Sequence, residues 1–172
     1  MINATIRPAF SNWPRYNRAL REVVAGLTDE QLAIRPSAER WPIWASIGHL
    51  ACQRVSGLCG MAGEPGAETT PFPDALFRCP GDEYLEPVMN AAQLVAALDS
   101  TFRIVERALD TWAFDSLEDE VHRDFGEYGS ATTTRAREIQ GSFAHDVYHI
   151  AELNETLAAQ GLPLVNIWGE EG

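Results

Sequence analysis

Four histidines are the residues of this 172-residue chain best suited to metal chemistry. His145 and His149 are four positions apart. In a helix this spacing puts two side chains on one face, with Cβ atoms about 5–6 Å apart. Two imidazoles at that separation can bind one divalent ion through nitrogens at about 2.0–2.1 Å from it. The same spacing also occurs on solvated helix faces, so the pair permits a metal site without requiring one.

The pair lies in a polar strip along a helix that we expect over residues 132–160. The strip consists of residues that recur about one turn apart: Glu138, Ser142, His145, His149, Glu152 and Thr156. Apolar residues flank it on both sides: Ile139, Phe143, Ile150, Leu153 and Leu157 on one, and Ala144, Val147, Ala151 and Ala158 on the other. A narrow polar strip between two apolar sectors can face the protein interior, and a plain solvated face is the alternative.

The other two histidines lie in different contexts. His49 falls in a second expected helix, residues 41–59, where Gly48 leaves room for close approach of another helix. A histidine in that position is either a ligand or a core residue bonded to a carbonyl. His122 lies in the polar segment 113–130 beside charged residues, so we expect it at the surface.

Four segments with helical apolar periodicity must position these residues. They are residues 12–25, 41–59, 90–112 and 132–160. The polar stretch 28–40 can also form a short helix at 29–33. Asn90 and Gln93 form a predicted capping box at the start of the third. Four apolar stripes can be buried only against one another, which predicts an all-α four-helix bundle in a single domain, residues 1–172. No strand pair is expected. A long connection, residues 60–90, joins the second and third helices and holds five of the ten prolines.

Composition excludes several functions. The net charge is −12 with no basic patch, which disfavours nucleic acids and anionic membranes as partners. No apolar run approaches the roughly 20 residues of a membrane-spanning helix. Residues 1–10 lack the apolar core of a signal peptide, so we expect a cytoplasmic protein. In that reducing compartment Cys52, Cys59 and Cys79 are expected to be buried free thiols.

Two motifs resemble those of the DinB-like proteins, including the YfiT-like metalloenzymes. Residues 39–50, ERWPIWASIGHL, resemble the second-helix motif of that family. Residues 145–153, HDVYHIAEL, resemble its fourth-helix motif, His-x-x-x-His followed by a polar residue that is often Gln. The first helix is also similar, at Trp13, Asn17 and Leu20. The order and spacing of the three motifs together are what make the resemblance specific.

The resemblance implies a four-helix bundle, often a homodimer, with one divalent ion bound by His49, His145 and His149. Zinc is the ion expected first, and nickel, manganese and iron remain open because imidazole suits several divalent ions. Glu152 stands where Gln is common in the family. Its carboxylate could be a fourth ligand, a proton acceptor or an orienting partner of His149, and Tyr148 is a second candidate for proton transfer.

Other metal-site patterns do not fit. Di-iron bundles use Glu-x-x-His, and no histidine here has Glu three residues before it. The zincin pattern needs Glu after its first histidine, where this chain has Asp146. Arg54, near the end of the second helix, is a candidate contact for an anion.

The ligand count predicts an open site. Three imidazoles leave a coordination position vacant, which is typical of catalytic zinc. We therefore expect a metal-dependent enzyme acting on a small molecule. A thiol S-transferase or isomerase using a low-molecular-weight thiol, or a hydrolase, would fit. The alternative is a non-catalytic, stress-related bundle with a structural metal ion.

Overall fold

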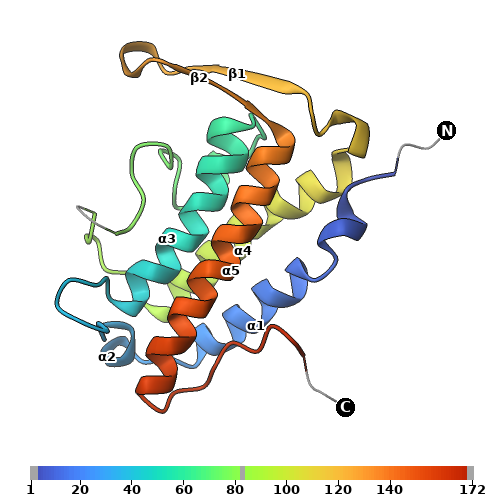
Figure 1. The fold of residues 1–172 in the computed structure, drawn as a ribbon. Coiled ribbons are helices and arrows are strands. Elements are labelled where there is room, and N and C mark those ends of the chain that lie inside the picture. The colour runs from blue at the N-terminus through green and yellow to red at the C-terminus, as the bar shows by residue number, and fades with distance from the viewer. Residues whose placement is uncertain (1–3, 82–83, 170–172) are drawn as a thin grey trace.

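The computed structural model describes residues 4–81 and 84–169, and it is mostly helical (Figure 1). Its α-helices are α1 (Trp13–Ala25), α2 (Asp29–Leu32), α3 (Ile43–Val55), α4 (Ala91–Thr111) and α5 (Arg135–Ala159). A π-helical turn, Ser56–Met61, extends α3. Short 3₁₀ turns occupy Arg7–Phe10, Ala67–Thr69, Phe114–Ser116 and Gly126–Tyr128. The four helices predicted from the periodicity are present, with ends that differ by a few residues, and a short helix also forms within residues 29–33.

The four long helices share one core. Helix α3 packs against both α4 and α5, and α1 packs against α4 (Figure 1). Their apolar stripes are fully buried, as at Trp13, Leu20, Ile47, Leu50, Leu98, Val105, Ile139 and Leu157. Burying a large aliphatic or aromatic side chain contributes about 1.5–3 kcal/mol, so these stripes hold α3 and α5 side by side. The prediction that the whole chain is one domain stays a prediction.

Side-chain caps fix where the helices begin. The predicted capping box is confirmed, since Asn90 accepts from the Gln93 amide and Gln93 accepts from the Asn90 amide. Thr134 caps α5 through its hydroxyl, which accepts from the Arg137 amide. Helix α5 therefore begins three residues later than predicted. Capping side chains of this kind satisfy amides that have no partner within the helix.

The expectation of an all-α chain without strands is wrong in one segment. Strands β1 (Glu120–Asp124) and β2 (Ser130–Thr134) pair antiparallel in a hairpin that extends from the top of the molecule in Figure 1. The polar composition of this segment concealed the hairpin. Its burial nevertheless alternates along both strands, and residues 132–134 are all threonine, which favours β structure. Gly126 and Gly129 adopt positive φ in the connecting turn.

The connection between α3 and α4 runs over α3 and is covalently attached to it. Cys52 of α3 forms a disulfide with Cys79, so the expectation of three free thiols is wrong for these two. Their separation of 27 residues gave no signal, because only the folded path of the connection brings Cys79 to the helix. Cys59 is a buried free thiol, as expected.

No helix within the described residues is both long and apolar enough to cross a membrane. The cytoplasmic location stays a prediction.

Candidate metal centre

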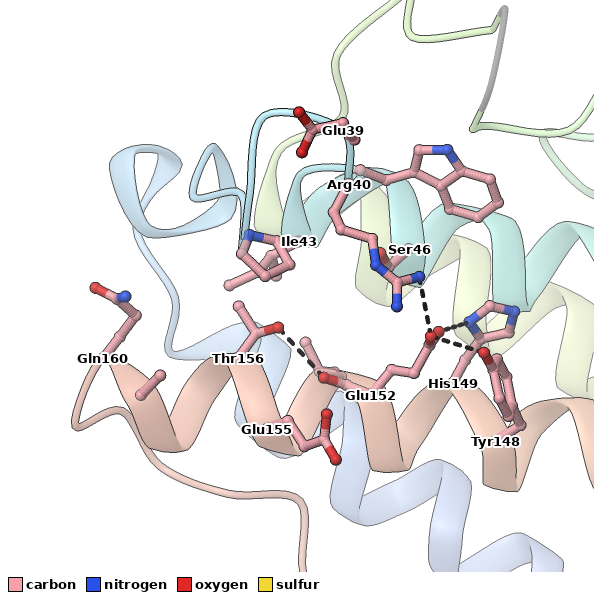
Figure 2. A pocket seen from close by; sticks show the side chains of 14 residues that line it. Glu39, Arg40, Ile43, Ser46, Tyr148, His149, Glu152, Glu155, Thr156 and Gln160 are labelled. Atoms are coloured by element: carbon pink, nitrogen blue, oxygen red, sulfur yellow. Dashed lines mark hydrogen bonds and ion pairs between the residues drawn. The ribbon is translucent and has the colours of Figure 1, made fainter.

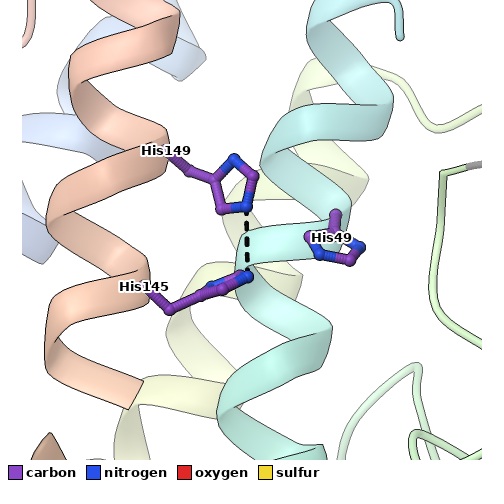
Figure 3. Close-up of side chains that lie close together, drawn as sticks. All are labelled: His49, His145 and His149. Carbon is purple, nitrogen blue, oxygen red and sulfur yellow. Dashed lines mark hydrogen bonds between the residues drawn. The ribbon is translucent and has the colours of Figure 1, made fainter. Parts of the chain in front are cut away.

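The three predicted ligands meet between two helices. His49 projects from α3, and His145 and His149 project from successive turns of α5 toward it (Figure 3). One nitrogen from each imidazole lies within 4.8 Å of the other two. His149 is buried and the other two side chains are half-buried. The structure thus brings together residues that are about a hundred positions apart in the sequence.

The two histidines of α5 approach each other through the same ring atom. Nε2 of His145 lies 3.1 Å from Nε2 of His149 (Figure 3). For a tetrahedral ion with Zn–N bonds of about 2.0–2.1 Å, two ligand nitrogens lie roughly 3.3–3.4 Å apart. The observed separation is close to that value. The Nδ1 atom of His145 is buried with no hydrogen-bond partner among the described residues, so the protein alone does not satisfy this ring.

Neighbouring groups select the tautomer of the other two rings. Nδ1 of His49 lies 2.9 Å from the carbonyl oxygen of Pro80. A carbonyl only accepts, so this nitrogen carries the proton and the lone pair lies on Nε2. Oε2 of Glu152 lies 3.0 Å from Nδ1 of His149, in a contact that is electrostatic rather than a well-aligned hydrogen bond. It favours the proton on Nδ1, again leaving the lone pair on Nε2. Outer partners of this kind orient metal-binding histidines.

Burial favours the neutral form of the two imidazoles on α5. The pKa of His145 is lowered to about 3, mainly by burial and in smaller part by the charges of His149, His49 and Arg54. Burial also lowers the pKa of His149, while Glu152 acts in the opposite direction. Because only the neutral imidazole can bind a metal, these directions favour the ligand form. Three converging basic nitrogens in a partly desolvated site fit a divalent cation.

Close packing around α3 brings the connection to the site. A Cβ atom on Gly48 would lie 3.0 Å from Cγ of Pro80, so a larger residue here would push the Pro80 carbonyl away from His49. The Trp41 ring lies 4.7 Å from the His49 ring and 6.4 Å from the His149 ring, measured between centroids. Trp41 therefore covers one side of the three-histidine cluster.

A pocket of about 480 Å³ adjoins His149 (Figure 2). Both predicted proton-transfer residues line it. The hydroxyl of Tyr148 donates to Oε1 of Glu152 at 2.8 Å, and Nη1 of Arg40 lies 3.4 Å from the same oxygen. The hydrogen bond to Glu152 raises the pKa of Tyr148 above its ordinary value. In this arrangement Glu152 lies at the Nδ1 side of His149, away from the atom that faces His145.

Comparison with known proteins identifies the family. The family model of the DinB superfamily matches residues 15–153, which include all three histidines. The chain belongs to the DinB superfamily. A DinB-like protein from Bacillus cereus ATCC 10987, solved by crystallography, is similar in fold, with a TM-score of 0.68 and 15% identity. The match covers 97% of this chain and 100% of that one. A comparison with curated proteins finds no match.

A buried ion pair lies beneath the histidines of this DinB chain, and sequence reasoning missed it. Arg54 and Asp146 are each 1% exposed, with Nη2 to Oδ2 at 2.7 Å and Nε to Oδ2 at 2.9 Å. Nε1 of Trp13 donates to the same Oδ2 at 2.7 Å, and Nη1 of Arg54 donates to Asn17 at 2.9 Å. Arg54 is therefore an internal partner of α5, and its predicted role as an anion contact is wrong.

A sequence signal for this pair exists. Arg54 follows Ile47 by seven residues and Leu50 by four, which places a lone cation on the apolar stripe of α3. Asp146 points about 100° around α5 from His145, so it enters the core while His145 faces the site. Trp13 and Asn17 of α1 complete the network.

The remaining candidates lie elsewhere in the DinB fold. His122 is exposed on β1 and contacts Thr132 Oγ1 at 3.1 Å, so its predicted surface position is confirmed. Cys52 lies one turn from His49, but its sulfur is bonded to Cys79.

Proposed function

We propose that this DinB protein binds one divalent metal ion through His49, His145 and His149, and that zinc is the ion best suited to the site. The observation that carries the proposal is the convergence of three imidazole nitrogens within 4.8 Å of one another. Tautomer selection by Pro80 and Glu152 supports it. Among the described residues the cluster has three members, which leaves a coordination position for a substrate.

We further propose that the centre is catalytic and acts on a small molecule. A divalent ion held there would supply Lewis acidity, lowering the pKa of a thiol or water or polarising a carbonyl. The pocket of about 480 Å³ has the size of sites for small ligands. Glu152 keeps the His149 ring oriented, and Tyr148 holds a proton at its hydroxyl beside that pocket.

The reaction class that fits best is transfer or isomerisation with a low-molecular-weight thiol, and hydrolysis is the second class. Neutral imidazole ligands leave most of the ion's positive charge uncompensated, which favours an anionic thiolate as the incoming ligand. We also propose the four-helix bundle architecture and the homodimer that the family resemblance implies. No nucleic acid and no membrane is proposed as a partner, because the net charge of −12 disfavours both.

Cobalt substitution tests whether the site is open. The absorption bands of bound cobalt respond to its coordination, so adding a small thiol or azide should change the spectrum and saturate at one equivalent per metal. Glu152→Gln is the second arm, since it removes a carboxylate that could rotate toward the metal. A response of the variant without a response of the wild type would mean that Glu152 closes the site.

If neither form responds, the ion is structural. The protein would then be the non-catalytic, stress-related bundle that is the alternative to an enzyme, and the catalytic proposal would be withdrawn. Metal binding itself would stand in that case, because the cobalt would still be present.

A further inference from the structure

The Cys52–Cys79 disulfide attaches the connection to α3 next to the metal centre. Cys52 lies one turn after His49 on the same helix. Cys79 immediately precedes Pro80, whose carbonyl oxygen lies 2.9 Å from Nδ1 of His49. Two adjacent residues of the connection therefore contact two successive turns of α3, one through a covalent bond and one through a metal-orienting hydrogen bond.

Residues 79–81 also make non-covalent contacts close to the metal centre, with α3 and with Trp41. The Pro80 ring packs against Gly48, and the backbone of Gly81 lies against the Trp41 ring, where an added Cβ would come within 2.8 Å. The earlier part of the connection is held independently. Phe72 and Ala75 are buried in the core, and Nε1 of Trp112 donates to Glu64 at 2.6 Å. The disulfide is thus the covalent attachment of segment 79–81 to α3, whereas residues 64–75 are held by contacts that do not depend on it.

We propose that the Cys52–Cys79 disulfide is a thiol-exchange site that sets the metal affinity of the three-histidine centre. The proposal rests on metal binding as proposed above and adds its regulation. Closed, the disulfide holds the Pro80 carbonyl against His49. Open, it releases that carbonyl, and the His49 ring loses the acceptor that selects its tautomer.

The exchange would proceed through the accessible sulfur. Cys79 is half-buried and Cys52 is fully buried, so an incoming thiolate attacks Sγ of Cys79. The disulfide bond breaks, and its electron pair leaves on Sγ of Cys52, which takes up a proton. A second thiol molecule attacks the mixed disulfide, releasing Cys79 as a thiol and the two reductant molecules as their own disulfide. Exposed Arg78, next to Cys79, favours an anionic low-molecular-weight thiol as the reductant.

The expected effect on zinc affinity follows from the loss of the Pro80 carbonyl as the hydrogen-bond partner of His49. Removing a group that orients a metal-binding histidine typically weakens metal affinity by about 10–100-fold. Reduction should weaken zinc binding by that factor and leave His145 and His149 in place. In metal-free protein, reduction of the disulfide should also speed amide hydrogen exchange at Cys79 and Gly81. The amides of α3 and α5 should keep their protection from exchange.

The experiment is a zinc titration of the full chain in its oxidised and reduced forms. A phosphine is the reductant because dithiols bind zinc themselves, and thiol counting by mass spectrometry verifies each state. Cys52→Ala/Cys79→Ala should have the affinity of the reduced chain and should not respond to reductant. The control, Cys59→Ala, removes a buried thiol outside the disulfide and should behave as wild type.

Equal affinity in the two states would overturn the proposal, as would tighter binding on reduction, which would make Cys52 a ligand. The reduced wild-type chain keeps the test valid if the double variant folds poorly. If the oxidised wild type binds no zinc at all, both this proposal and the proposed function fail. If it binds zinc with an affinity that reduction leaves unchanged, the regulation alone fails.

Discussion

Replacing Asp146 by Asn should destabilise the protein more than any substitution of a surface charge. Asp146 and Arg54 are both 1% exposed, and their closest atoms are 2.7 Å apart. The variant leaves the guanidinium buried with neutral partners, among them the Asn17 side chain and the Leu98 carbonyl. Removing one member of a buried ion pair costs about 3–5 kcal/mol, because the other charge stays desolvated. We expect the free energy of unfolding to fall by that amount.

A double-mutant cycle separates the pair from its surroundings. Arg54→Met alone should cost a similar amount, because the Asp146 carboxylate then keeps only the Trp13 indole as a hydrogen-bond donor from the network. Arg54→Met/Asp146→Asn leaves no buried charge, so its cost should be clearly less than the sum of the two single costs. Interaction energies between contacting residues reach about 3 kcal/mol. The assay is urea unfolding followed by far-UV circular dichroism.

A surface pair provides the matched control. Arg21 and Asp99 also lie 2.7 Å apart but are about one third exposed, at 36% and 33%. Asp99→Asn should cost about 0–1 kcal/mol. Equal costs for Asp146→Asn and Asp99→Asn, or strict additivity in the cycle, would refute the description of a desolvated ion pair beneath the histidines.

Two further predictions concern the site. Glu152→Ala should weaken zinc binding by about 10–100-fold through loss of the partner at Nδ1 of His149, whereas Glu155→Ala, on the rim of the same pocket, should leave zinc affinity unchanged in the same titration. A larger loss in the Glu155 variant would contradict the role given to Glu152. The second concerns acid stability without metal. The unfolded-state pKa of histidine is about 6.5 and that of folded His145 is about 3, so between these values the unfolded chain binds more protons. Stability should therefore fall as pH drops, by up to about 1.4 kcal/mol per pH unit for this group. In chelator-treated protein His145→Asn should lose less stability than wild type between pH 7 and pH 5. The full slope applies only below about pH 6.5, so this interval contains about one and a half units of it. Identical losses would show that burial of His145 is not the cause.

Much of the helical fold was predictable because its signals are local. Apolar periodicity located the helices, and the Asn90–Gln93 capping box marked the start of α4. The ligand set was predictable for a different reason. His145 and His149 need only one helix to share a face, and the family resemblance supplied His49 as their partner from another helix.

The features that were missed depend on contacts between distant segments. Cys79 reaches Cys52 only because the connection folds over α3, and no spacing in the sequence encodes that path. The Pro80 carbonyl is a backbone group, so no side chain identified it as a partner of His49. The hairpin was missed because a short polar segment with two glycines resembles a loop when only its hydrophobicity is considered.

Metal content of four histidine variants tests the central claim most directly. Each of His49→Ala, His145→Ala and His149→Ala should lose most of the bound metal when the proteins are purified and analysed in parallel. His122→Ala should keep the wild-type ratio of one ion per chain, because that side chain is exposed on β1. Circular dichroism of each variant checks that the helices persist. Loss of metal in the His122 variant as complete as in the His145 variant, or full retention in any of the three ligand variants, would contradict the assignment of the site.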